Sequence, residues 1–260
     1  MFYALHRERP VSLSLWLVVG ITLISLLFSV GSSAASTDLK VLVRADDAKY
    51  IGSGVGGLNV TIKDTVTGEL LSHGVISGGT GDTTALMKKS HSRGRSPVAG
   101  DPASFQTALE LQRPTRIEIS VSGPLDVAQS SQSVSTTLWM IPGTHRVETP
   151  VILHMPGLIT DLVSYSLENR TLSLTASVTM ICGCPITAGG LWDAAEFVAV
   201  VQLYQDGEHI VEAPLEFTGN DNEFAGSIKV PDAGDFDMVV YAYQQNTGNT
   251  GVYQRPLRVN

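Results

Sequence analysis

The pattern of hydrophobic and polar positions changes from one long apolar run near the start of the chain to short alternating segments after residue 36. In residues 58–63 and 117–122, apolar side chains occupy every second position. A period of two is typical of a β-strand with one face in a core. No stretch after residue 36 repeats apolar residues at helical spacing over a substantial length. The sequence therefore predicts an all-β fold.

The expected strands fall into two groups on either side of Pro156-Gly157. Those of the first group are residues 39–44, 58–63, 70–76, 104–111, 117–122, 133–140 and 147–153. Those of the second are residues 162–167, 172–181, 197–204, 209–217, 223–230, 236–245 and 251–259. Seven short strands separated by turn signals suit a β-sandwich. We therefore predict two tandem β-sandwich modules, residues 36–158 and 159–260, with a boundary between residues 157 and 161.

Residues 1–35 have the pattern of an export signal. Arg7 and Arg9 precede an apolar run over residues 11–30, and small residues follow, with Ser33 and Ala35 placed for cleavage before Ser36. A run of this length also has the length of one membrane span, so an uncleaved anchor is the alternative. Both interpretations place the remainder of the chain outside the cytoplasm, in a periplasmic or extracellular location.

The charges are distributed unequally between the two predicted modules. Residues 36–158 hold 11 basic and 11 acidic side chains, whereas residues 159–260 hold 4 basic and 13 acidic ones. An acidic second half argues against nucleic acid as a partner, because phosphates would be repelled. Residues 78–103 form a basic segment rich in Gly, Ser, Thr and Pro. Its composition predicts a long mobile loop outside any core, either a docking strip or a solvated insertion.

The two cysteines of the chain, Cys182 and Cys184, are separated by one glycine. Strand alternation places Met180, Cys182 and Cys184 on the same side of the chain. Two thiolates and a thioether are a soft ligand set that suits Cu(I), with His154 as a candidate further ligand from the module junction. Copper is therefore the candidate metal, although the sequence requires no cofactor.

Two other interpretations of the cysteine pair stay open. A Cys-x-Cys pair can act in thiol-disulfide exchange, but no neighbouring Lys, Arg or His is present in the sequence to lower a thiol pKa. Alternatively, both cysteines are buried or bridged to each other and serve packing alone. The sequence does not decide among the three.

Part of the first module resembles a known family. Residues 57–64 (GLNVTIKD), 67–71 (TGELL) and 80–83 (TGDT) follow the pattern of prealbumin-like carboxypeptidase regulatory modules, with a Gly-led strand, a Thr-Gly turn and a second strand. This resemblance implies a β-sandwich for residues 36–158.

The second module resembles immunoglobulin domains. Residues 232–238 (DAGDFDM) are similar to the Asp-x-Gly-x-Tyr-x-Cys signature at the corner between strands E and F, with Phe236 in place of the tyrosine and Met238 in place of the cysteine. Trp192 is placed like the buried tryptophan of strand C. The resemblance implies an immunoglobulin-like scaffold and says little about function.

Catalytic motifs are missing from the sequence. There is no Gly-x-Ser-x-Gly, His-Glu-x-x-His or Walker sequence, so the common hydrolase and nucleotide-dependent reactions have no support. We therefore expect a non-enzymatic accessory or adhesive subunit of the cell envelope that acts through protein–protein contacts. The alternatives are a copper-binding protein and a thiol-disulfide redox protein.

Overall fold

The computed structural model describes residues 34–90, 93 and 98–260, and most of them lie in β-strands. The prediction of an all-β fold is confirmed, and each expected strand is present with ends shifted by a few residues. In the first half, the strands are β1 (Ala35–Ala45), β2 (Leu58–Asp64), β3 (Leu70–Ile76), β4 (Phe105–Leu111), β5 (Thr115–Gly123), β6 (Gln132–Met140) and β7 (Arg146–Met155). Two 3₁₀ turns accompany them, η1 (Ser53–Val55) and η3 (Ala128–Ser130).

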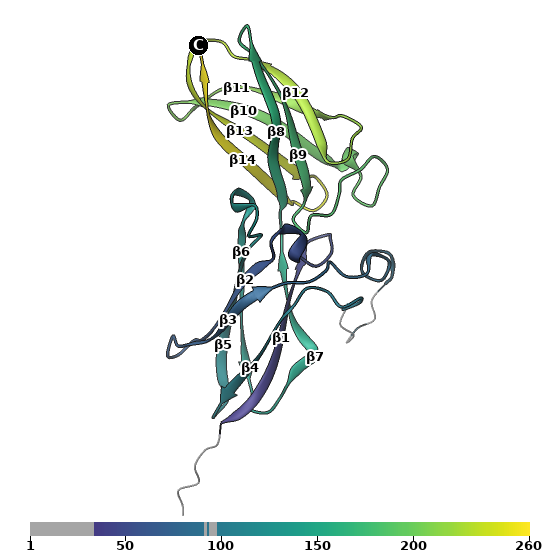
Figure 1. Ribbon diagram of the computed structural model, residues 1–260, viewed down its shortest axis with the longest axis vertical. Helices are drawn as coiled ribbons and strands as arrows, with labels where there is room; N and C mark the ends of the chain where they lie inside the picture. Colours follow the sequence, from purple (N-terminus) through teal and green to yellow (C-terminus); the bar gives the residue numbers. More distant parts are fainter. Residues whose placement is uncertain (1–33, 91–92, 94–97) are drawn as a thin grey trace, which may run out of the picture. The chain divides into compact units, whose positions relative to one another are not determined.

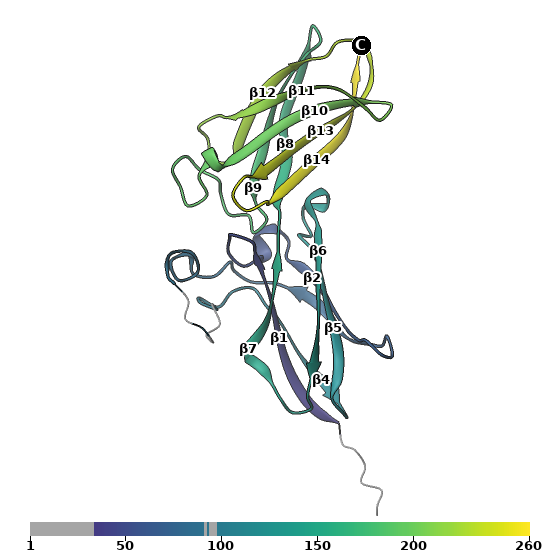
Figure 2. The same cartoon turned by 180° about the vertical axis from the view of Figure 1, so that it is seen from behind.

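The strands of the first half form two sheets, with the orders β4-β1-β7 and β3-β2-β5-β6. Figures 1 and 2 show these sheets as two layers. Strand β1 pairs antiparallel with β4 and parallel with β7. Alternate side chains of both sheets enter one shared core, among them Val41 and Val43 of β1, Ile62 of β2 and Ile119 of β5. The period-two pattern therefore buries one face of each sheet against the other.

The second half contains seven further strands. They are β8 (Leu158–Glu168), β9 (Thr171–Met180), β10 (Phe197–Gln205), β11 (Glu208–Phe217), β12 (Glu223–Lys229), β13 (Gly234–Gln244) and β14 (Thr250–Val259). Their order in the sheet is β14-β13-β10-β11-β12-β9-β8. Strand β8 also packs against β13 and β14 at the other end of this order. The β8-β9-β12 part thus lies across from the β10-β13-β14 part, as the two opposite views show (Figures 1 and 2).

This strand order fits an immunoglobulin-like sandwich. If β8, β9, β10, β12, β13 and β14 are strands A, B, C, E, F and G, then A-B-E and C-F-G are neighbours, with β11 between C and E. Phe236 and Met238 of the predicted corner are buried on β13. Trp192 is also buried, but it lies in the loop before β10 rather than within the strand.

The expectation that residues 78–103 take no part in a core is wrong for Leu86. This residue lies in a short π-helical turn, η2 (Thr84–Lys88), and packs in a small buried cluster with Leu42 and Tyr50. Three consecutive apolar residues of β1, 41–43, place Leu42 on the face opposite the main core. The loop covers that face, and the Arg44 guanidinium donates to the Leu86 carbonyl at 3.2 Å. Composition alone gave no sign of this contact.

The predicted signal or anchor, residues 1–35, lies almost entirely outside the described residues, so its cleavage and the export of the chain stay predictions. Across residues 34–90, 93 and 98–260, no helix is long and apolar enough to span a membrane. Only Pro156 and Gly157 separate β7 from β8. Ala35–Asn260 clusters as one compact unit, and its division into two modules stays a prediction.

Candidate functional site

Cys182 and Cys184 lie in a tight turn directly after β9. They form a disulfide with each other, and both side chains are buried. Gly183 between them has a φ of +75°, a conformation that favours glycine, and its N–H donates to the Met180 carbonyl at 2.7 Å. The Met180 N–H donates in turn to the Cys184 carbonyl at 3.1 Å. The turn is thus closed both covalently and by backbone hydrogen bonds.

The other two predicted metal ligands are placed differently. Met180 is fully buried on the inner face of β9, whereas His154 on β7 is exposed and pairs with Asp46 at 3.3 Å. Within the described part of the chain, no three His, Cys, Asp or Glu side chains are grouped so that they could hold a metal. Thiolates for Cu(I) would require the disulfide to be reduced, so copper binding and thiol exchange stay predictions for a reduced protein. The structure instead has the locally bridged, buried pair, the third of the interpretations.

The disulfide turn and the loop that follows it contact the first half of the chain. A Cβ added at Gly183 would meet the Val55 side chain at 2.9 Å. The Ile181 N–H donates to the Gly157 carbonyl at 3.3 Å, and the Trp192 indole N–H donates to the Asp47 carbonyl at 2.8 Å. The turn that contains the cysteines therefore lies at the junction at which the two sets of sheets meet.

A buried polar network around Asn249 completes this junction. The Asn249 side-chain oxygen accepts from the Gly157 N–H at 2.8 Å, while its amide donates to the Asp46 carbonyl at 3.0 Å and to Gln244 at 3.1 Å. The Gln244 amide donates to the Asp47 carboxylate at 2.9 Å. Because buried polar groups are costly when unpaired, such a network specifies one geometry.

The clearest candidate for a binding surface is the outer face of the β11-β10-β13-β14 part of the second sheet. The register places four apolar or aromatic side chains in one row across its four strands: Pro214, Val200, Tyr241 and Val252. Val198 and Tyr243 form a second such pair beside this row. These six residues, the Tyr241 band, are half-buried or exposed, and Tyr243 and Val252 are 36% and 37% exposed. A contiguous exposed apolar band marks an interaction site more often than isolated surface residues do.

The outer face of the β3-β2-β5-β6 sheet is different. Its cross-strand rows are mainly hydrophilic: one contains Ser133, Ser122 and Asn59, and the next contains Ser135, Ser120 and Thr61. Such residues are the usual solvated face of a sandwich. Exposed apolar side chains on this face are Val75, at the β3 end of the first row, and Trp139 opposite Arg116. The Tyr241 band differs from this face because its apolar and aromatic side chains continue in one row across four strands.

Acidic side chains border the Tyr241 band. The next row across the strands begins with Glu212, and the row after it contains Asp237. Burial raises the pKa of Tyr241, and the neighbouring Glu212 carboxylate raises it further. Both effects keep this phenol neutral, and the band carries no positive charge of its own.

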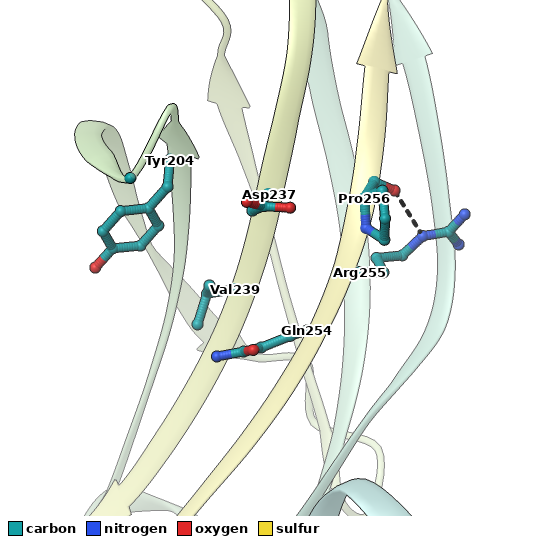
Figure 3. A pocket seen from close by; sticks show the side chains of 7 residues that line it. Tyr204, Asp237, Val239, Gln254, Arg255 and Pro256 are labelled. Atoms are coloured by element: carbon teal, nitrogen blue, oxygen red, sulfur yellow. Dashed lines mark hydrogen bonds between the residues drawn. The ribbon is translucent and has the colours of Figure 1, made fainter.

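A groove opens beside the Tyr241 band, over the paired residues Tyr204 and Asp237. Its volume is about 520 Å³. Figure 3 shows Tyr204 on one side of the groove, Pro256 on the other and Asp237 between them. The residues that line it are Tyr204, Gly207, Asp237, Val239, Gln254, Arg255 and Pro256.

Sequence reasoning identified these strands but not their outer face. The signal that could have found it is the unbroken apolar run of residues 197–201, followed by residues 238–243, which contain Val239, Val240, Tyr241 and Tyr243. A strand that is apolar at successive positions places apolar side chains on both faces of its sheet.

The chain shows only distant similarity to known proteins. No protein-family model matches the chain, and no curated protein matches it. A DUF3823 family protein from Bacteroides ovatus is similar in structure at 9% identity and a TM-score of 0.34, with 85% of this chain and 100% of that chain covered. The interferon gamma receptor alpha chain of chicken is similar at 11% identity and a TM-score of 0.33, with 86% and 98% covered.

A third similar structure is the β-glucuronidase of Parabacteroides merdae, at 10% identity and a TM-score of 0.22. The match covers 86% of this chain but only 25% of the enzyme. At TM-scores this low, none of the three similarities carries an inference about fold or function.

Proposed function

We propose that this chain is a non-enzymatic subunit of the cell envelope, located outside the cytoplasm, that binds a protein partner through the Tyr241 band. The observation that carries the proposal is the row of Pro214, Val200, Tyr241 and Val252 across four neighbouring strands. Burying apolar and aromatic side chains of this kind is the main source of affinity at protein interfaces, where tyrosine is enriched.

Charge favours a partner with a basic surface. The second half holds 4 basic and 13 acidic side chains, and the acidic residues Glu212 and Asp237 border the band. A second copy of the chain would bring the same acidic border against itself, and like charges facing each other disfavour that contact. A basic partner gains attraction over the same border, and this attraction weakens as salt increases.

The assignment of each half of the chain to a particular type of β-sandwich belongs to the same proposal. We infer a prealbumin-like module for residues 36–158, which the division of seven strands into sheets of three and four supports. For residues 159–260 we infer an immunoglobulin-like module, supported by the strand order and the buried corner residues. In this arrangement the first module positions the second and leaves its outer face accessible.

The test is a comparison of two matched double variants in affinity purification from envelope extracts. Tyr243→Ser with Val252→Ser removes exposed apolar surface from the band, whereas Leu70→Ser with Val75→Ser removes similarly exposed side chains from β3. We expect the first variant to lose the partner that the wild-type chain captures, with an affinity reduced about 10-fold or more, and the second to retain it. Equal capture by all three proteins, or no reproducible partner for any of them, would contradict the proposal.

A further inference from the structure

We propose that the groove beside the Tyr241 band is a subsite for a single cationic side chain, a lysine or arginine of the partner. This inference rests on the proposed function, since it assigns the chemistry of one contact within that docking surface. Three features of the groove support it: an immobilised aromatic ring, an uncompensated carboxylate, and a lining arginine that is occupied elsewhere.

The Tyr204 ring is held in place by a closed set of contacts. Its hydroxyl donates to the Gln202 side-chain oxygen at 2.8 Å, and the Gln202 amide donates to the Glu212 carboxylate at 2.7 Å. The same carboxylate oxygen lies 3.4 Å from His209 Nε2, and the His209 ring packs edge-on against Tyr204 with centroids 5.5 Å apart. A ring fixed in this way presents its π-face without the entropy cost of ordering it on binding.

Asp237 supplies the negative charge. It lies on β13 directly opposite Tyr204 in the strand register, and its side chain is exposed toward the groove. Among the described residues, no hydrogen bond or ion pair engages its carboxylate. An unpaired carboxylate next to an aromatic ring offers both a salt bridge and a cation–π contact to one ligand group.

The arginine in the groove lining does not neutralise this carboxylate. Arg255 turns away from Asp237, as Figure 3 shows, and its Nε donates to the Pro256 carbonyl at 3.3 Å. The Arg255 guanidinium carbon lies over the Tyr165 ring on β8, 4.7 Å from its centroid. The Arg255 guanidinium therefore leaves the Asp237 carboxylate available to a cationic group of a ligand.

The donor set selects an organic cation over a metal ion. Calcium and magnesium take several oxygen ligands, and the groove lining contains one carboxylate. An arginine side chain suits the site better than lysine, because its planar guanidinium can stack on Tyr204 and bond to both carboxylate oxygens of Asp237. A volume of about 520 Å³ is ample for such a side chain.

The test uses the full chain and two small probes, N-acetyl-arginine methylamide and its uncharged citrulline counterpart. Backbone amide shifts in ¹H–¹⁵N spectra are followed as each probe is titrated into wild type, Asp237→Asn, Tyr204→Leu and the control Asp221→Asn, which is on the distant β11–β12 hairpin. We expect saturable shifts at residues 204–207, 237–239 and 254 with the arginine probe, and about 10-fold weaker binding or none with citrulline.

We expect Asp237→Asn to weaken arginine-probe binding about 3- to 5-fold and Tyr204→Leu about 2- to 5-fold, with Asp221→Asn unchanged. Non-saturating shifts spread over all acidic residues, equal binding of citrulline, or an unaffected Asp237→Asn variant would each overturn the subsite. Failure of the proposed function would be recognised by a different result, equal capture of the partner by wild type and by the Tyr243→Ser and Val252→Ser variant. A groove that binds no probe in a chain whose partner capture depends on the band would reject the subsite alone.

Discussion

Replacing Asn249 with alanine is predicted to destabilise the protein strongly. The Asn249 side chain makes three hydrogen bonds, to the Gly157 N–H, the Asp46 carbonyl and Gln244, and it is 1% exposed. A buried hydrogen bond contributes about 1 kcal/mol to stability, and a partner left unpaired without water costs about as much or more. The Gln244 oxygen keeps its bond from Thr247, so the loss is greatest at Gly157 and Asp46. We expect a decrease of about 3 kcal/mol in the free energy of unfolding.

The measurement is urea unfolding followed by far-ultraviolet circular dichroism and by tryptophan fluorescence. Trp192 is a local reporter because its indole bonds to Asp47 at the same junction. Asn220→Ala is the matched control, since Asn220 is exposed on the β11–β12 hairpin and pairs with Glu223. We expect the control to stay within about 0.5 kcal/mol of wild type.

Substitution of Asn249 by aspartate separates the size of the side chain from its hydrogen bonds. Aspartate can still accept from Gly157, but it cannot donate to the Asp46 carbonyl, and it introduces a charge in a buried position. It should therefore destabilise at least as much as alanine. If Asn249→Ala lost less than about 1 kcal/mol, or if aspartate were tolerated, the argument that this network fixes the junction would be refuted.

Two further substitutions test the disulfide turn and the small cluster under the basic loop. Gly183→Ala should destabilise the protein by about 1–3 kcal/mol, because φ at this position is +75° and the new Cβ would lie 2.9 Å from the Val55 side chain. Urea unfolding measures this loss, and an unchanged midpoint would show that the turn accommodates alanine. Tyr50→Phe should preserve or raise stability, by up to about 1 kcal/mol, since none of the described residues forms a hydrogen bond with the buried Tyr50 hydroxyl. Burial also raises the pKa of Tyr50 above 10, so the unfolded chain loses this proton first and stability should fall above pH 10. A wild type whose loss of stability between pH 9 and pH 11 is no steeper than that of Tyr50→Phe would argue against this.

Local pattern was a reliable guide to the strands because their side-chain alternation is written directly into the sequence. Leu172, Leu174, Ala176, Val178 and Met180 were expected on one face of a strand, and all five are buried on the inner face of β9. The predicted ligand set containing His154 could not be decided in the same way, because the distance between β7 and the disulfide turn depends on how distant strands associate. Burial of Leu86 was missed for the same reason, since its partner Leu42 is 44 positions earlier in the chain.

The amino-acid sequence by itself determined that this chain is built from β-strands, which segments form them, and which side chains of each strand face inward. Those properties depend on residues two positions apart, and hydrophobic burial acts on them wherever the strand lies. Tertiary structure alone decided which strands are neighbours, and so placed Pro214, Val200, Tyr241 and Val252 in one row and Asp237 opposite Tyr204. Strand pairing is fixed by the packing of the whole chain, and a binding surface made of four strands exists only after that pairing is set.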